Sequence, residues 1–208
     1  MRIMIIVAGL PPVYNGGTEI ATVEIARYAA RAEHEVHVIA LDGTWNDGEA
    51  YKSVQNGFTV HRIWSPPLSY LYSLSAVPRS VVTMLSIRPD IIHAQSISTA
   101  PIAFVASRIG NIPFILYGRG EIYTNWLSKG PSHRFFLKRA NRVIAQTEHM
   151  KSKMLEYYKR EIEVIPNGVN TERFGKISKW EARGRLGLAQ DKKIVLSVGR
   201  FRPEKNLK

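Results

Sequence analysis

The amino-terminal segment constrains the fold most, because a buried strand pattern, a glycine-containing loop and a helix pattern follow one another there. Residues 2–8, RIMIIVA, are an almost continuous run of apolar and β-branched side chains, which is typical of a parallel strand buried on both faces. Gly16 and Gly17 open a helix predicted to reach about residue 32, with three side chains facing the sheet: Ala21, Ile25 and Ala29. This order predicts an α/β fold, a Rossmann-like doubly wound sheet, mostly parallel, with helices on both faces.

The rest of the chain continues the alternation of strands and helices. Further strands are predicted at 34–40, 57–64, 89–96, 113–118, 142–147, 162–165 and 193–198, and residues 42–56 are predicted to be a polar loop. Helices are predicted within 65–87, and at 99–109, 131–141, 149–158 and 179–186. Pro166 ends its strand because proline cannot donate to a sheet, and the following Asn167-Gly168 suits a turn with positive φ.

Composition excludes several classes of protein. The 208 residues are 45% hydrophobic, which is enough for a domain with a real core. No apolar run approaches the ~18–20 residues of a membrane span, and the first residues lead into a strand rather than a signal peptide, so we expect a cytoplasmic protein. The absence of cysteine excludes disulfides and thiolate metal sites.

The positive charge lies mainly in the second half of the chain. The net charge is +12, and residues 129–160 hold nine basic against two acidic residues, whereas residues 1–120 hold nine against eight. Nucleic acid, an anionic membrane or a phosphorylated small molecule could exploit such a field. A solvated basic face that binds nothing is an equal alternative.

Two interpretations fit the glycine loop before the first helix. Gly16 and Gly17 could let a ligand approach the backbone, where the free N–H groups of the helix terminus attract an anion. The pair could equally be a simple turn. The spacing differs from GxGxxG, which argues against a dinucleotide site.

Polar residues also stand at the carboxyl ends of two later strands. His93 and Gln95 end one strand, and Arg119 follows another. In open α/β sheets this edge lines the ligand crevice, although His93 also fits a buried structural role. Arg119 cannot act as a base near neutral pH, but it can bind phosphate or carboxylate bidentately. The alternative for Arg119 is an ion pair with Glu121 that clamps the loop.

The segment 131–141, PSHRFFLKRAN, predicts an amphipathic basic helix with two adjacent phenylalanines. Such a helix could rest on an anionic bilayer. In the alternative arrangement, Phe135 and Phe136 both enter the core and the charges face water.

Three segments resemble family 4 glycosyltransferases, which are retaining enzymes of the GT-B fold. They are VIPNGVNTERF followed by VLSVGRFRPEK, ANRVIAQTEHMKSKM, and PDIIHAQ. The resemblance implies an acceptor-side Rossmann-like domain at 1–170, a linker at 171–192, and the start of a nucleotide-sugar-binding domain at 193–208. The chain would then stop one strand into its second domain.

The resemblance also implies a set of site residues. Donor diphosphate would be bound by Gly16, Gly17, Gly199, Arg200 and Lys205. The acceptor and the sugar would be bound by Glu19, His93, Gln95, Arg119, Gly120 and Glu121. Gln95 replaces a histidine of the family pattern, and Arg119 stands where many relatives have a histidine that contacts the transferred sugar. Catalysis would depend on Arg119, Arg200 and Lys205.

The implied reaction is transfer of a sugar from a UDP- or GDP-sugar to a glycan or lipid-linked acceptor, with retention and without a metal or cofactor. The resemblance places the family's Glu-x7-Glu motif in a later part of the second domain, so we expect the 208-residue chain alone to be inactive. The helix at 131–141 would provide peripheral contact with the inner face of the cell membrane, and no nucleic acid is expected. Two rivals are a non-catalytic carbohydrate-binding domain and a basic module that binds membranes or nucleic acid.

Overall fold

The computed structural model describes residues 1–43, 52–64, 71–119, 131–171 and 174–198. Two compact units make up the chain, Met1–Gly168 and Val169–Lys208. The described helices include none that is both long and apolar enough to cross a membrane.

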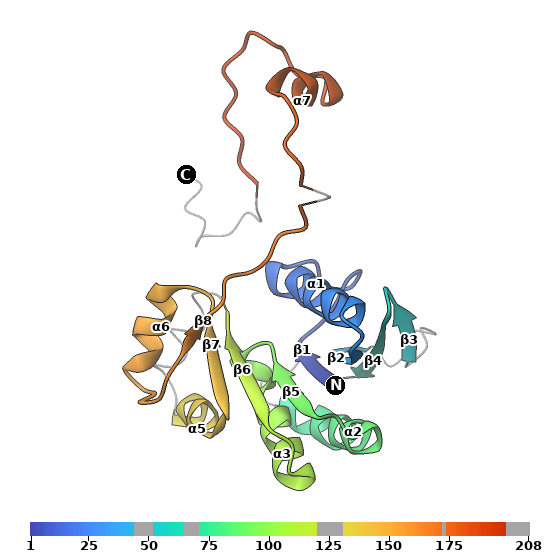
Figure 1. Ribbon diagram of the computed structural model, residues 1–208, viewed down its shortest axis with the longest axis vertical. Coiled ribbons are helices and arrows are strands. Elements are labelled where there is room, and N and C mark those ends of the chain that lie inside the picture. Colours follow the sequence, from blue (N-terminus) through green and yellow to red (C-terminus); the bar gives the residue numbers. More distant parts are fainter. Residues whose placement is uncertain (44–51, 65–70, 120–130, 172–173, 199–208) are drawn as a thin grey trace. The chain divides into compact units, whose positions relative to one another are not determined.

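The first unit is built on one eight-stranded sheet in the order β3-β4-β2-β1-β5-β6-β7-β8 (Figure 1). Its strands are β1 (Arg2–Val7), β2 (Glu35–Gly43), β3 (Lys52–Gln55), β4 (Phe58–Trp64), β5 (Ile91–Ala94), β6 (Phe114–Gly118), β7 (Arg142–Ala145) and β8 (Glu163–Val164). Every pairing is parallel except that of β3 with β4. The predicted doubly wound, mostly parallel sheet is therefore confirmed.

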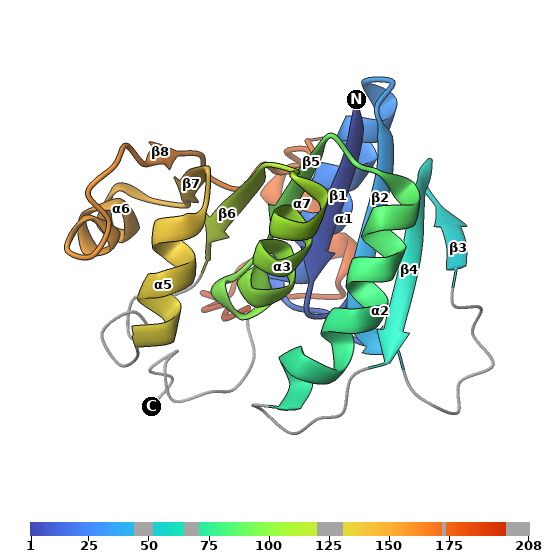
Figure 2. The ribbon, with the colours of Figure 1, turned by 90° about the horizontal axis from the view of Figure 1, so that it is seen from below.

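Helices cover both faces of this sheet. They are α1 (Gly17–Arg31), α2 (Leu71–Ile87), α3 (Ala100–Gly110), α5 (Pro131–Arg139) and α6 (Glu148–Leu155), with a short 3-10 turn η1 (Ile97–Thr99) before α3. α1 lies on one face, whereas α2 and α3 lie side by side on the other (Figures 1 and 2).

The central strand β1 contributes to a separate core on each face. Met4 and Ile6 belong to the cluster beneath α2 and α3, and Ile5 and Val7 belong to the cluster beneath α1. All four side chains are buried. Alternate residues of a strand point to opposite faces, so the unbroken apolar run of β1 follows directly from its position between two helical layers.

The face of α1 that packs on the sheet includes two of the three predicted positions, since Ile25 and Ala29 are partly buried against the cluster beneath α1. The fully buried positions are Thr22 and Ala26, each one residue on from a predicted position. The threonine is tolerated there because its hydroxyl donates to the carbonyl oxygen of Thr18 at 2.7 Å. A hydroxyl satisfied within its own helix behaves as a small core group.

The predicted polar loop at 42–56 contains the strand β3, which the sequence analysis missed. β3 pairs antiparallel with β4 across a turn at Asn56-Gly57, where φ is 48° and 86°. An Asn-Gly pair suits a turn in which both central residues have positive φ. This dipeptide was the available signal for a hairpin.

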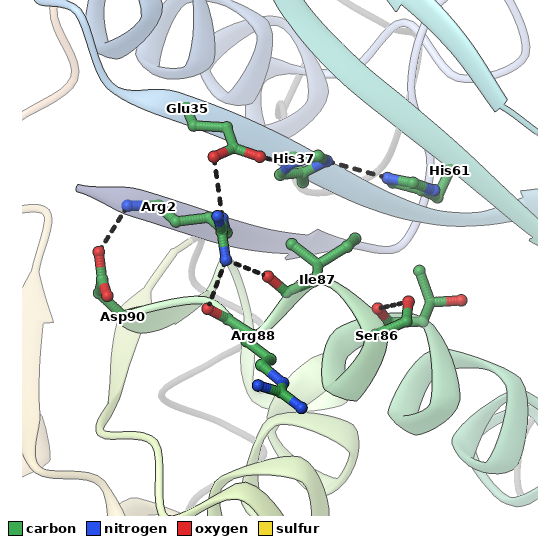
Figure 3. A network of polar contacts seen from close by, with 9 residues as sticks. Arg2, Glu35, His37, His61, Ser86, Ile87, Arg88 and Asp90 are labelled. Atoms are coloured by element: carbon green, nitrogen blue, oxygen red, sulfur yellow. Dashed lines mark hydrogen bonds and ion pairs between the residues drawn. The ribbon is translucent and has the colours of Figure 1, made fainter.

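A polar network joins β1, β2, β4 and the end of α2 at the amino-terminal side of the sheet (Figure 3). The Arg2 guanidinium donates to Glu35 at 2.9 Å and to the carbonyl oxygen of Arg88 at 3.2 Å, while its backbone N–H donates to Asp90 at 2.6 Å. The His37 ring bridges Glu35 and His61, at 3.0 Å and 3.1 Å. These contacts hold the end of the sheet at which the parallel strands begin, opposite the carboxyl ends of the strands where the predicted site residues lie.

The second unit contains α7 (Lys179–Arg185), where the Ser178 hydroxyl caps the N-terminus by accepting from the Glu181 N–H at 3.1 Å. The Arg183 side chain donates to three carbonyl oxygens, of Ala189, Gln190 and Lys192. Residues 193–198, predicted to be a strand, are not in a sheet, and Val195 is fully exposed. A strand requires a hydrogen-bonded neighbour, and the described residues of this unit provide none.

Candidate functional site at the carboxyl edge of the sheet

The order in which successive strands are added to the sheet reverses at β1, with β2 on one side of it and β5 on the other. The loops that follow β1 and β5 therefore diverge at the carboxyl edge, and ligands of doubly wound folds bind in the crevice at such a point. The predicted residues Gly16 and Arg119 follow parallel strands at this same edge, and His93 lies within β5, one residue before its carboxyl end.

The helix α1 begins at this edge with no side chain to cap it. Gly16 is its N-cap, with φ −98° and ψ 173°, and makes no side-chain hydrogen bond to the first turn. A Cβ added at Gly17 would meet no atom within 4 Å. The free N–H groups of a helix N-terminus attract anions, and the side-chain position of Gly17 in this first turn is open.

A buried ion pair holds the loop between β1 and α1. The Asp42 side chain is fully buried and accepts from the Leu10 backbone N–H and from Arg62, both at 2.7 Å. Arg62 also donates to the carbonyl oxygen of Pro11 at 2.9 Å. This pair could not be predicted from the sequence, because Asp42 and Arg62 are 20 residues apart and nothing local distinguishes them from solvated charges.

Arg119 lies just past β6, and its side chain is fixed from two sides. Its Nη1 donates to the Asn167 side-chain oxygen at 2.7 Å, and its Cζ lies 4.1 Å from the centroid of the Tyr117 ring. The Tyr117 hydroxyl donates to the carbonyl oxygen of Ile165. Arg119 is only 7% exposed, and within the described residues its Nε and Nη2 have no hydrogen-bond partner.

His93 and Gln95 lie at the end of the neighbouring strand β5. The Gln95 amide nitrogen lies 3.4 Å from His93 Nδ1, and the His93 ring stacks on Tyr117 with 5.9 Å between ring centroids. Gln95 is completely buried. Its Oε1 and the His93 Nε2 are buried without a partner among the described residues. Buried polar groups are nearly always hydrogen-bonded, so these two atoms without partners call for an explanation, such as a ligand or an ordered water.

Burial and charge set the protonation of this cluster. Burial, and secondarily the charge of Arg119, lower the pKa of His93 to about 4, so its ring is neutral near pH 7. Burial also lowers the pKa of Arg119 and raises that of Tyr117. The carboxylate of Glu19 is close enough to raise the pKa of Arg119 in opposition to burial, which places α1 and β6 within electrostatic reach of each other.

We expect acid to destabilise the first unit through two histidines. The pKa of His61 is also lowered to about 4, by burial first and then by His37 and Lys52. The unfolded chain takes up protons near pH 6.5 whereas the folded chain does not, so stability is complete above pH 6.5 and falls as the pH drops toward 4. Each histidine contributes at most about 1.4 kcal/mol per pH unit. Urea midpoints at pH 7 and pH 5 should differ less for His93→Gln and for His61→Gln than for the unaltered chain, and an equal difference would contradict this assignment.

One prediction near the site is wrong. Neither Asn167 nor Gly168 has a positive φ. Asn167 is used through its side chain, which orients Arg119 across 48 residues of sequence.

Five predicted site residues, Gly120, Glu121, Gly199, Arg200 and Lys205, lie outside the described residues. The alternative ion pair of Arg119 with Glu121 therefore stays a prediction. The described residues contain no group of three or more His, Asp or Glu side chains that could hold a metal ion.

Comparison with solved structures gives one consistent fold. Sucrose-phosphate synthase from Thermosynechococcus elongatus superimposes with a TM-score of 0.79 at 18% identity, over 98% of this chain and 57% of that one. HepE from Anabaena, solved in complex with UDP and glucose, gives a TM-score of 0.66 at 19% identity, over 90% of this chain and 50% of that one. These likenesses show the glycosyltransferase GT-B fold.

Comparison with curated proteins also finds similarity to glycosyltransferases. A D-inositol 3-phosphate glycosyltransferase of Streptosporangium roseum is 25% identical over 91% of this chain and 49% of its own length. A putative teichuronic acid biosynthesis glycosyltransferase of Bacillus subtilis is 30% identical over 57% of this chain and 32% of its own length. The chain thus spans about half the length or less of these relatives. The model of Glycosyltransferase Family 4 matches residues 15–173, which is more than half of the 208 residues, and the chain therefore belongs to that family.

Proposed function

We propose that this chain is the acceptor-binding half of a glycosyltransferase that moves a sugar from a nucleotide-sugar donor to a glycan or lipid-linked acceptor with retention of configuration. One observation carries the proposal. The uncapped start of α1 and the buried Arg119 face the same carboxyl edge of a switch point, where donors and acceptors of a doubly wound fold can meet.

The proposed chemistry needs a stabilised leaving group. Transfer breaks the bond between the anomeric carbon and a diphosphate oxygen, and negative charge grows on that oxygen. Gly16 and Gly17 would supply backbone N–H groups to it, while Gly199, Arg200 and Lys205 would supply a strand end and two cations. Positioned donors of this kind can take the place of a metal ion. The protein would thus need neither a metal nor a cofactor.

The remaining carboxylates of the donor site, a Glu-x7-Glu pair, are assigned to sequence outside these 208 residues. Residues 1–170 would form the acceptor-side domain, 171–192 the linker and 193–208 the start of the donor domain. We therefore expect no turnover from residues 1–208 alone.

The proposal includes a cytoplasmic location with peripheral contact to an anionic membrane. This contact is in keeping with a lipid-linked acceptor in polysaccharide biosynthesis. On α5, Phe136 packs against the core, whereas Phe135 is 41% exposed, with the Arg139 guanidinium 4.9 Å from its ring centroid. A surface cavity of about 450 Å³ beside α5 is lined by Arg134, Lys138, Glu156, Tyr157, Tyr158, Lys159 and Arg160. An exposed ring among cations supports binding to phosphate headgroups.

The experiment that tests the proposal is a thermal-shift panel of UDP- and GDP-sugars on the full-length protein, with and without EDTA. A donor present at 100 times its Kd adds about 2.7 kcal/mol to the free energy of unfolding. The donor that raises the melting temperature should release its nucleoside diphosphate when an acceptor is added, equally well in EDTA. Vesicles of anionic lipid should sediment the same protein, and less of it after Phe135→Ser.

Other outcomes would point to the rivals. Stabilisation by free sugars with no response to any nucleotide sugar would favour a non-catalytic carbohydrate-binding domain. Salt-dependent retention on DNA with no response to UDP or GDP would favour a nucleic-acid-binding module.

A further inference from the structure

We propose that the cluster formed by Arg119, His93 and Gln95 recognises a sugar that carries an anionic group, a carboxylate or a phosphate, next to free hydroxyls. The inference rests on the proposed function and names the substrate class of the same site. It depends on which atoms of the cluster are already bonded and which are not.

The unbonded atoms of Arg119 form one edge of its guanidinium. Nη1 is occupied by Asn167, whereas Nε and Nη2 have no partner among the described residues. Nε and Nη2 together present two parallel N–H donors, the arrangement that binds both oxygens of a carboxylate or two oxygens of a phosphate. The free edge is thus the one suited to a planar anion.

Among the described residues, no carboxylate forms a hydrogen bond or an ion pair with Arg119, although Glu19 acts on it from a distance. The described partners of Arg119, the Asn167 amide and the Tyr117 ring, are neutral, and no ion pair joins it to Glu19. A guanidinium that is 7% exposed gives up most of its hydration. Burying a charge is costly unless it is paired. An anionic ligand would supply the missing counter-charge.

His93 and Gln95 would bind the hydroxyl groups of the same ligand. The Gln95 amide donates to His93 Nδ1 in this orientation, so the neutral ring carries its proton on Nε2. His93 Nε2 is then a buried free donor and Gln95 Oε1 a buried free acceptor. A sugar hydroxyl both accepts and donates, and it can satisfy the two atoms together.

A purely structural role explains these observations less well. A guanidinium that only braced the β8 segment would need the single bond to Asn167, and a lysine or glutamine could make it from a similar position. A structural residue has no need of a free, buried bidentate edge next to an unbonded amide oxygen and an unbonded ring nitrogen. The combination of free donors and a free acceptor is the pattern of a ligand site.

The test uses the full-length protein and pairs of matched probes. D-glucuronate and its neutral isostere D-glucuronamide differ only in the charge of one group, and glucose 6-phosphate and glucose differ by the phosphate. We expect at least one anionic probe to bind at least 10-fold more tightly than its neutral counterpart in isothermal titration. The anion that shows this preference separates a carboxylate from a phosphate ligand.

Arg119→Lys keeps the charge but removes the two parallel donors, so the preference should fall at least 10-fold. Arg108→Lys is the matched control, because Arg108 also lies over an aromatic ring, Phe104, but on the exposed surface of α3. It should leave the preference unchanged. Gln95→Leu should weaken binding of both members of a pair equally, since it removes a hydroxyl contact only.

The possible results separate this inference from the proposed function. Equal binding of charged and neutral probes, or a preference that survives Arg119→Lys, would overturn the anionic assignment while leaving nucleotide-sugar binding intact. Preference for an anionic sugar by a protein that ignores every nucleotide sugar would support the assignment and refute the transferase. An Arg119→Lys variant that has lost cooperative unfolding is replaced by Arg119→Gln and judged by the same ratio.

Discussion

Asp42→Ala is expected to lower the free energy of unfolding of the first unit by about 3–5 kcal/mol, because it removes the buried carboxylate with which Arg62 forms an ion pair. The change also removes the acceptor of the Leu10 backbone N–H, which is buried in the same place. Urea unfolding followed by circular dichroism measures the loss. Asp42→Asn keeps an oxygen acceptor but no charge, so its free energy of unfolding should lie between those of the unaltered protein and of Asp42→Ala.

The exposed pair of Arg142 and Glu161 provides the control. Its atoms lie 3.9 Å apart, and both side chains are more than half exposed. Glu161→Ala should therefore change stability by less than about 1 kcal/mol. If Asp42→Ala cost no more than Glu161→Ala, the pair would not be anchoring the glycine loop. The double variant Asp42→Leu with Arg62→Met should recover part of the loss, since it removes both charges.

Replacing Arg200 and Lys205 with alanine in the full-length protein should abolish sugar transfer while the protein stays folded. Loss of one positioned donor to a developing negative charge costs roughly 10²–10³-fold in kcat. Because both cations would act on the same diphosphate, we expect at least about 10³-fold for the double variant, with effects that need not multiply. Release of nucleoside diphosphate measures the rate, and thermal unfolding checks the fold.

Arg202→Ala is the matched change for this experiment, because it removes a cation from the same short segment. It should retain most of the activity. Full activity of the double variant would remove both residues from the donor site, and an equal loss of activity in Arg202→Ala would indicate a general effect of charge rather than two specific contacts.

Much of the fold could be predicted because its signals are local. The run RIMIIVA has to be a strand buried on both faces, and Met4 and Ile5 do lie in cores on opposite sides of the sheet. Pro166 ends β8 as expected. The hairpin at Asn56-Gly57 was missed although its turn residues were visible, because β3 is short and alternates exposed and partly buried positions, as a polar loop can.

The candidate site could be predicted only as a set of strand tips. His93 and Gln95 lie at the end of one strand and Arg119 follows another, which was visible in the sequence. That Asn167 would bind Arg119, or that Asp42 would bind Leu10 and Arg62, depends on which strands become neighbours. Contacts between residues 20 or more apart are consequences of the completed sheet and leave no periodic mark on the chain.

Residues in and just after β6 hold the chain beyond β8 through two contacts. Tyr117 holds the carbonyl of Ile165, and Arg119 holds the side chain of Asn167. Any substitution of Arg119 would therefore also remove a contact that holds the chain near the end of the first unit. A variant at this arginine would need another hydrogen-bond donor to the Asn167 side chain to keep the chain in place.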